Sequence, residues 1–221
     1  QHGFLKDRST NTALYDLTKF ITEAVDSGDA VLGCSIDMTK AFDSASHSVL
    51  LASLEACGVR SVALDWFQSY LHKRPWVVSL EVSGRRVESP PCFANRGVPQ
   101  GSVLGPLLFL ILINGLPDEL KDDHTHTVIY ADDCNFVVRR KAFQDCESAL
   151  KAKFTQAKAW LTGRELRLNE NKTVCMVFEA KRKPGRSTAI QLEGITLPYS
   201  ETTKFLGVTI DRTLSCTYHV Q

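Results

Sequence analysis

Two adjacent carboxylates, Asp132 and Asp133, lie between two short apolar runs, and this pattern constrains the fold more than any other. The runs at 127–129 and 136–138 are rich in β-branched residues, so each predicts a strand. The residues between them, 131–135, predict a tight turn, because Asp and Asn tolerate left-handed backbone angles. We therefore expect a β-hairpin with both acidic side chains at its tip, where their mutual repulsion favours a bound cation.

A third carboxylate lies upstream in a similar setting. An apolar run over 31–36 predicts another strand, and Asp37 follows it directly. An Asp-Asp pair alone is more often a solvated turn, and the second strand-end acid changes that balance. Aspartates at the ends of neighbouring strands suit two Mg²⁺ ions about 3.5–4 Å apart, the arrangement for in-line nucleotidyl transfer. Two or three carboxylates suffice, because Mg²⁺ keeps part of its shell for waters and substrate phosphates.

A loop rich in Gly and Pro, at 95–106, precedes an apolar segment at 107–116 that predicts a helix. Such a loop at a helix start indicates close backbone approach to a ligand, although many such loops only turn a corner. Gln100 is its most informative side chain. An amide both donates and accepts hydrogen bonds, which suits contact with a base or a backbone in a groove.

The remaining pattern predicts an α+β domain, an antiparallel sheet with helices packed on one face and the carboxylates on its central strands. Apolar residues at helical spacing predict helices over 13–25, 61–71 and 142–161. The aromatic residues of the 61–71 helix are expected in the core rather than on a base-stacking platform. Ser83-Gly84 and Glu193-Gly194 predict the turns of two further hairpins.

Composition excludes several classes of protein. The longest apolar stretch, 107–113, is too short to span a bilayer, so we expect no membrane partner. Seven cysteines without a Cys-x-x-Cys pair predict buried free thiols in a reducing, intracellular compartment. The net charge of +1 does not itself indicate a nucleic-acid binder, but an acidic metal site offsets basic grooves elsewhere. The basic segment 181–186 is expected to be a solvated loop more often than a phosphate contact.

Short segments in a fixed order then indicate a family. They are Gln-His-Gly-Phe at 1–4, Asp-Met-Thr-Lys-Ala-Phe-Asp at 37–43, Gly-Val-Pro-Gln-Gly-Ser at 97–102 with Leu-Gly-Pro at 104–106, Tyr-Ala-Asp-Asp at 130–133, Asn-Glu-Asn-Lys at 169–172, and Phe-Leu-Gly at 205–207. The chain resembles the reverse transcriptase domain of retrotransposons that lack long terminal repeats, the LINE-like elements, and is most similar to the jockey-like insect type. The resemblance implies a polymerase palm plus part of the fingers over 1–221, with the upstream finger strands and the thumb not included.

The resemblance implies catalytic roles for individual residues. Asp37 and Asp132 are expected to bind two Mg²⁺ ions, for which Mn²⁺ is the substitute, together with the carbonyl of Met38 and with Asp133 close to the metals. The ions would lower the pKa of the primer 3′-hydroxyl and clamp the triphosphate. Lys172 is similar to a lysine near the leaving pyrophosphate, where it donates a proton or stabilises charge. A surface lysine before a strand is the equally weighted alternative.

The resemblance also implies contacts to the substrates. Phe42 is expected under the incoming sugar, where its ring excludes ribonucleotides by occupying the space of a 2′-hydroxyl. The alternative is a core residue that anchors the turn from strand to helix. The other implied contacts, to the deoxynucleoside triphosphate (dNTP), the template and the primer, are made by Gln100, Gly101, Ser102, Tyr130, Phe205, Leu206 and Gly207.

The expected function is therefore an RNA-directed DNA polymerase that copies retrotransposon RNA into DNA. Its partners would be an RNA template, a DNA primer and dNTPs, and it would work in the nucleus during reverse transcription. An RNA-dependent RNA polymerase is one rival, which Phe42 disfavours because ribonucleotides need room there. A non-catalytic nucleic-acid-binding remnant of an inactive element is another, and it predicts lost carboxylates, whereas this chain retains all three. A purely structural α+β domain gives no reason for acids at two strand ends.

Overall fold

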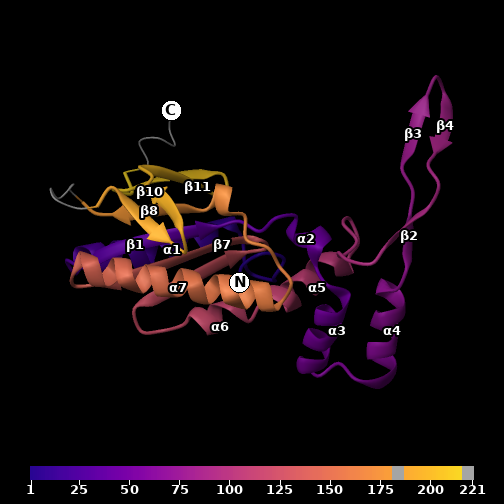
Figure 1. The fold of residues 1–221 in the computed structure, drawn as a ribbon, viewed down its shortest axis with the longest axis horizontal. Helices are drawn as coiled ribbons and strands as arrows, with labels where there is room; N and C mark the ends of the chain where they lie inside the picture. Colours follow the sequence, from indigo (N-terminus) through magenta and orange to yellow (C-terminus); the bar gives the residue numbers. More distant parts are fainter. Residues whose placement is uncertain (181–186, 216–221) are drawn as a thin grey trace.

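A four-stranded antiparallel sheet forms the centre of the computed structural model, which describes residues 1–180 and 187–215 (Figure 1). Its strand order is β6 (Thr125–Tyr130), β7 (Asp133–Arg140), β1 (Ala30–Ile36) and β8 (Val174–Phe178). Six of the seven residues of β1 are buried, as expected for a strand that is paired on both edges and covered on both faces. The basic segment 181–186 lies outside the described residues.

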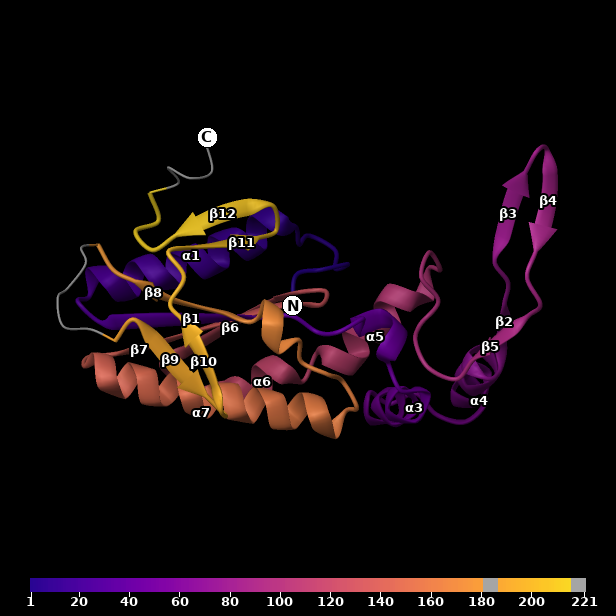
Figure 2. The same ribbon diagram turned by 45° about the horizontal axis from the view of Figure 1, so that its top comes forward.

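Helices cover both faces of this sheet (Figure 2). On one face α7 (Phe143–Gly163), α5 (Leu104–Ile113) and α6 (Leu116–Leu120) enclose the larger core, which includes Leu32 and Phe136. On the other face α1 (Thr10–Asp26) packs over the smaller core, which includes Val31 and Val137. The predicted α+β class is confirmed. The expectation of helices on one face is wrong, because neighbouring apolar residues of β1 and β7 point to opposite faces and both faces need a cover.

The sequence specifies α1 locally. Ser9 forms a capping box with Thr12: the Ser9 hydroxyl accepts from the Thr12 backbone N–H at 3.2 Å, and the Ser9 backbone N–H donates to Thr12 Oγ1 at 2.9 Å. Four small or aliphatic residues at helical spacing make the buried stripe that faces the sheet: Ala13, Leu17, Ile21 and Ala24.

A helical region and an arm lie at the other end of the molecule (Figure 1). The helices are α2 (Ala41–Ser44), α3 (His47–Ala56) and α4 (Ser61–Leu71). In the arm β2 (Arg74–Trp76) pairs with β5 (Cys92–Ala94), and β3 (Ser79–Val82) with β4 (Arg85–Glu88) forms the predicted hairpin beyond them. The prediction that the aromatic residues of α4 belong to the core is wrong for Trp66. That side chain is 51% exposed and stacks on Tyr70.

After α7, the chain adds a short 3-10 helix, η1 (Glu170–Lys172), and two hairpins beside the sheet. β9 (Ala189–Leu192) pairs with β10 (Ile195–Pro198) as predicted, and β11 (Thr202–Phe205) pairs with β12 (Val208–Asp211). The six described cysteines are free thiols. Four of them are buried as predicted, whereas Cys57 and Cys92 are exposed. In the part of the chain that is described, no helix is long and apolar enough to cross a membrane.

Candidate active site

The first strand-end carboxylate, Asp37, follows the buried strand β1. Its backbone is fixed by a distant segment: Asn169 N donates to the Asp37 carbonyl at 2.8 Å, and Thr39 N donates to the Arg167 carbonyl at 2.8 Å. Met38 lies between these two bonds in an antiparallel bridge with Leu168 and is buried. This pairing extends strand geometry past the end of β1. It therefore holds the Asp37 carboxylate at the edge of the sheet.

The other two carboxylates lie at the tip of the hairpin between β6 and β7. Tyr130 pairs with Asp133, so only Ala131 and Asp132 make the turn. The predicted turn over 131–135 is too long, because Cys134 and Asn135 already belong to β7 and have buried side chains. Ala131 takes the left-handed conformation, with φ of +55°, where the sequence indicated Asp or Asn.

The register of the sheet brings the three acids to one edge. The pairing of β1 with β7 ends at Ile36 opposite Cys134, so Asp37 and Asp133 are the next residues on the two neighbouring strands. Asp132 precedes Asp133 at the hairpin tip. The juxtaposition predicted from two separate motifs is therefore present in the structure.

The electrostatics of this edge show a surplus of negative charge. Partial burial raises the pKa of Asp133, and the charges of Asp132 and Asp37 raise it further, while the Lys172 ammonium lowers it. Lys172 Nζ lies 3.4 Å from Asp37 Oδ2, and Asn169 Nδ2 donates to the same oxygen at 3.2 Å. Among the described residues, Lys172 is therefore the cation that lowers the pKa of Asp133, against two carboxylates that raise it.

The donor set has the chemistry of a divalent-cation site. Carboxylate oxygens are hard ligands that suit Mg²⁺ or Mn²⁺, and their mutual repulsion at the hairpin tip is relieved by added positive charge. Among the residues described, however, no three His, Cys, Asp or Glu side chains are arranged to hold a metal ion. In this structure Asp37 binds Asn169 and Lys172 instead.

Phe42 lies on α2, five residues after Asp37. Its ring packs against the fully buried ring of Phe109 on α5, with centroids 4.4 Å apart and an interplanar angle of 30°. Its side chain is half-buried, and its carbonyl accepts a hydrogen bond from Val98 N at 2.9 Å. These contacts fit an anchor between the turn and the core. The role of Phe42 against the sugar stays a prediction.

The loop at 95–103 folds back on α2. Gly97 N donates to the Ala45 carbonyl at 2.7 Å, and Gly97 itself has φ of +87°. The Ser102 hydroxyl is engaged inside the loop: it donates to the Pro99 carbonyl at 2.7 Å and accepts from Gly105 N at 3.0 Å. Ser102 therefore holds the loop against the start of α5, and its contact with the template stays a prediction. The neighbouring Gly101 is exposed, with φ of +78°.

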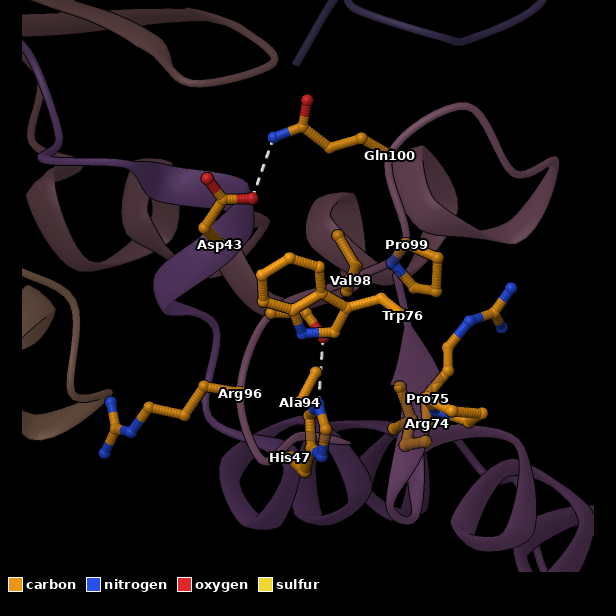
Figure 3. A pocket seen from close by; sticks show the side chains of 12 residues that line it. Asp43, His47, Arg74, Pro75, Trp76, Ala94, Arg96, Val98, Pro99 and Gln100 are labelled. Carbon is orange, nitrogen blue, oxygen red and sulfur yellow. Dashed lines mark hydrogen bonds between the residues drawn. The ribbon is translucent and has the colours of Figure 1, made fainter. Parts of the chain in front are cut away.

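Gln100 is exposed and borders a cavity of about 690 Å³ (Figure 3). Gln100 Nε2 donates to Asp43 Oδ1 at 2.8 Å, and the Trp76 indole lies between that pair and His47. The sequence prediction included Gln100 but missed the other polar and aromatic residues of this wall. Asp43 could have been predicted as a site residue, because it is the last residue of the 37–43 motif. Trp76 on the arm belongs to no motif, so nothing in the sequence indicated that it would lie at this cavity.

The remaining predicted residues lie on the α1 side of the sheet. Leu206 and Gly207, with φ of +49° and +85°, form the turn between β11 and β12. Phe205 is buried in the smaller core, and the half-buried Tyr130 packs against the same core. Within the described ranges, no hydrogen bond or ion pair joins these side chains to the three carboxylates. Their roles toward primer and nucleotide stay predictions.

A comparison with known proteins relates this geometry to a family. A family model described as "Reverse transcriptase (RNA-dependent DNA polymerase)" matches residues 1–210. The chain is 30% identical over 226 residues to the probable RNA-directed DNA polymerase from transposon BS of Drosophila melanogaster. It is 28% identical over 225 residues to the RNA-directed DNA polymerase from the mobile element jockey of the same species. Each match covers 100% of this chain and 24% of the relative, so the chain spans about a quarter of their length.

Solved structures share the fold at low sequence identity. Telomerase from Candida tropicalis in complex with the TWJ fragment of telomeric RNA superposes with a TM-score of 0.63 at 16% identity, covering 92% of this chain and 32% of that one. The apo enzyme from the same organism gives a TM-score of 0.62 at 14% identity, covering 92% and 35%. Reverse transcriptases as a family use divalent metal ions. The resemblance to jockey-type enzymes drawn from the motifs is confirmed, and the chain belongs to the reverse transcriptase (RNA-dependent DNA polymerase) family.

Proposed function

We propose that this chain is the polymerase core of an RNA-directed DNA polymerase that copies retrotransposon RNA into DNA by adding dNTPs to a primer 3′-hydroxyl. The observation that carries the proposal is the meeting of Asp37 with Asp132 and Asp133 at one sheet edge. Membership of the reverse transcriptase family supports nucleotidyl transfer as the reaction at this acidic edge.

The carboxylates present have the donor chemistry for a pair of divalent cations, although in the described residues their side chains are not arranged around a metal ion. Asp37 and Asp132 would hold two Mg²⁺ ions, with the Met38 carbonyl and Asp133 as further oxygen donors. When bound, the ions would supply a lowered pKa at the primer 3′-hydroxyl and neutralise charge on the triphosphate. Acceptance of a cation requires Asp37 to exchange its contact with Lys172, whose side chain is 67% exposed and free to turn.

The chain's own side chains supply the rest of the chemistry. Lys172 keeps an ammonium within reach of the acidic edge, where it can neutralise or protonate a leaving pyrophosphate. The Phe42 ring, held by Phe109, would bound the sugar of the incoming nucleotide. Gln100, oriented by Asp43, would contact the nascent base pair or the template.

Primer extension on an RNA template tests this proposal. The chain would be expressed as the longest reading frame that encodes it, and Mg²⁺ would be titrated with a choice of dNTPs or ribonucleotides. We expect dNTP incorporation that Asp132→Asn abolishes. Asp65→Asn is the matched control, because Asp65 is exposed on α4 and has the same charge to lose. A folded protein that binds primed template and extends nothing at any Mg²⁺ or Mn²⁺ concentration would instead support the non-catalytic remnant.

We also propose that the protein works in the nucleus, where chromosomal DNA would supply the primer. The family resemblance supports this, because elements of the jockey type insert copies into chromosomes. Microscopy of the tagged full reading frame in insect cells tests it. A protein that is excluded from nuclei while an element carrying it transposes would contradict the proposal.

A further inference from the structure

The entry segment of the chain contacts the tip of the catalytic hairpin. In Figure 2 the N-terminus lies beside the turn between β6 and β7. Gln1 Oε1 accepts a hydrogen bond from Ala131 N at 3.0 Å, and Gln1 Nε2 lies 3.5 Å from the Ala131 carbonyl. His2 N donates to the Ile129 carbonyl at 2.8 Å. Residues about 130 positions apart in sequence therefore share one hydrogen-bonded unit.

The Gln1 side chain is itself fixed in place. Its oxygen also accepts from His2 N at 2.9 Å and from Gly3 N at 2.8 Å, so three N–H groups converge on one acceptor. The buried His2 ring ties the segment to α1 through Thr12 Oγ1 at 3.0 Å and Asp16 Oδ2 at 3.4 Å. The amide thus reaches the hairpin from a rigid support.

Gly3 allows the close approach. A Cβ added at this position would lie 2.6 Å from Ala131 N and 3.2 Å from Ala131 Cα, which no side chain fits without displacing the turn. The backbones of Gly3 and Ala131 therefore pack directly against each other.

The hairpin tip needs outside support because of its own conformation. Ala131 has φ of +55°, a region that alanine disfavours, and the residue after it carries the Asp132 carboxylate. A two-residue turn of Ala-Asp lacks the Gly or Asn that stabilises such turns locally. Contacts from Gln1 and Gly3 therefore stabilise a turn conformation that the Ala-Asp sequence does not stabilise by itself.

We propose that Gln1 and Gly3 are positioning residues for catalysis, which bracket the Ala131 backbone and so hold the Asp132 carboxylate at the sheet edge. The inference rests on the proposed polymerase function for its catalytic consequence, whereas the bracket itself is measurable without activity. Neither residue is expected to touch the substrate.

The test compares four variants in the longest reading frame that encodes the chain. Gln1→Met keeps the side-chain length and removes the amide, and Gly3→Ala inserts the excluded Cβ. Gln1→Glu keeps the oxygen that accepts the three N–H groups. Gln156→Met is the matched control, since the Gln156 amide donates to the Glu119 carbonyl at 2.8 Å between α7 and α6, away from the hairpin.

Two readouts separate positioning from general destabilisation. Hydrogen exchange reports the Ala131 amide directly, and single-nucleotide extension gives kcat, KM for primed template and the Mg²⁺ concentration for half-maximal rate. For Gln1→Met and Gly3→Ala we expect faster exchange at Ala131, a fall in kcat of about 10- to 100-fold, a higher Mg²⁺ requirement and an unchanged KM. Gln1→Glu should restore slow exchange at Ala131, because a carboxylate oxygen still accepts its N–H, and Gln156→Met should match the wild type in both readouts.

The inference is overturned if Gln1→Met exchanges Ala131 as slowly as the wild type, or exchanges it faster with kcat unchanged. If Gln1→Met does not fold, Gln1→Asn takes its place, because the shorter amide cannot reach all three N–H groups. A wild type that never extends primer refutes the proposed function alone. In that event the exchange measurement still decides whether the bracket exists.

Discussion

Replacement of Gly97 by alanine tests how closely the loop that carries Gln100 packs on α2. Gly97 has φ of +87°, and an added Cβ would lie 2.8 Å from the Asp43 carbonyl oxygen and 3.0 Å from Asp43 Cα. Gly58 has a similar φ of +94°, but a Cβ there meets no atom within 4 Å. The two glycines therefore share backbone strain on substitution and differ only in the clash.

The contacts of the two glycines give the expected difference in unfolding free energy between Gly97→Ala and Gly58→Ala. A left-handed alanine costs roughly 1–2 kcal/mol, which is the whole effect expected for Gly58→Ala. At Gly97 the loop must also move, which breaks the bonds from Gly97 N to the Ala45 carbonyl at 2.7 Å and from Val98 N to the Phe42 carbonyl at 2.9 Å. At about 1 kcal/mol net for each bond, Gly97→Ala should lose about 2 kcal/mol more than Gly58→Ala.

Urea unfolding of both variants and the wild type measures this difference. At a slope of about 1–3 kcal/mol per molar urea, the extra loss moves the midpoint by about 1 M. Equal midpoints for the two variants would refute the close approach of the loop to Asp43. Slopes that differ between the variants would mean that the unfolded or native states had changed, and the comparison would then use thermal unfolding instead.

Two further predictions concern the nucleotide site and the pH dependence of stability. Phe42→Val should lower the preference for deoxynucleotides over ribonucleotides by about 10- to 200-fold in kcat/KM, because the ring that Phe109 supports is removed; unchanged selectivity would make Phe42 a core anchor only. Burial alone would raise the pKa of Asp211, but hydrogen bonds from Thr213 and Ser215 outweigh it and lower this pKa from 3.8 to about 2. The depressed pKa means that Asp211 stabilises the fold by roughly 2 kcal/mol above pH 3.8, and that this contribution disappears as the pH falls toward 2. Unfolding curves of the wild type and Asp211→Asn should therefore converge near pH 2, and curves that stay parallel would contradict this account.

The sequence alone determined the features that depend on short-range physics. Short apolar runs, rich in β-branched residues on both sides of the Asp-Asp pair, predicted β1, β6 and β7, and helical spacing predicted α1 and α7. The turns at Ser83-Gly84 and Glu193-Gly194 followed from glycine's access to positive φ, which the structure contains at both glycines. The two strand-end acidic motifs also predicted a shared acidic edge. Each of these signals involves residues within a few positions of one another.

Tertiary structure decided how those pieces meet, because the contacts join residues far apart in the chain. Asn169 reaches Asp37 across 132 positions and Gln1 reaches Ala131 across 130, and neither pairing has a local signal. The prediction also missed that helix α1 covers the second face of the sheet. The composition of a strand does not say which distant helix will pack on it. The left-handed Ala131 is the clearest case: its own preference opposes the turn, whereas the pairing of Tyr130 with Asp133 and the contacts with Gln1 and Gly3 all come from the tertiary structure.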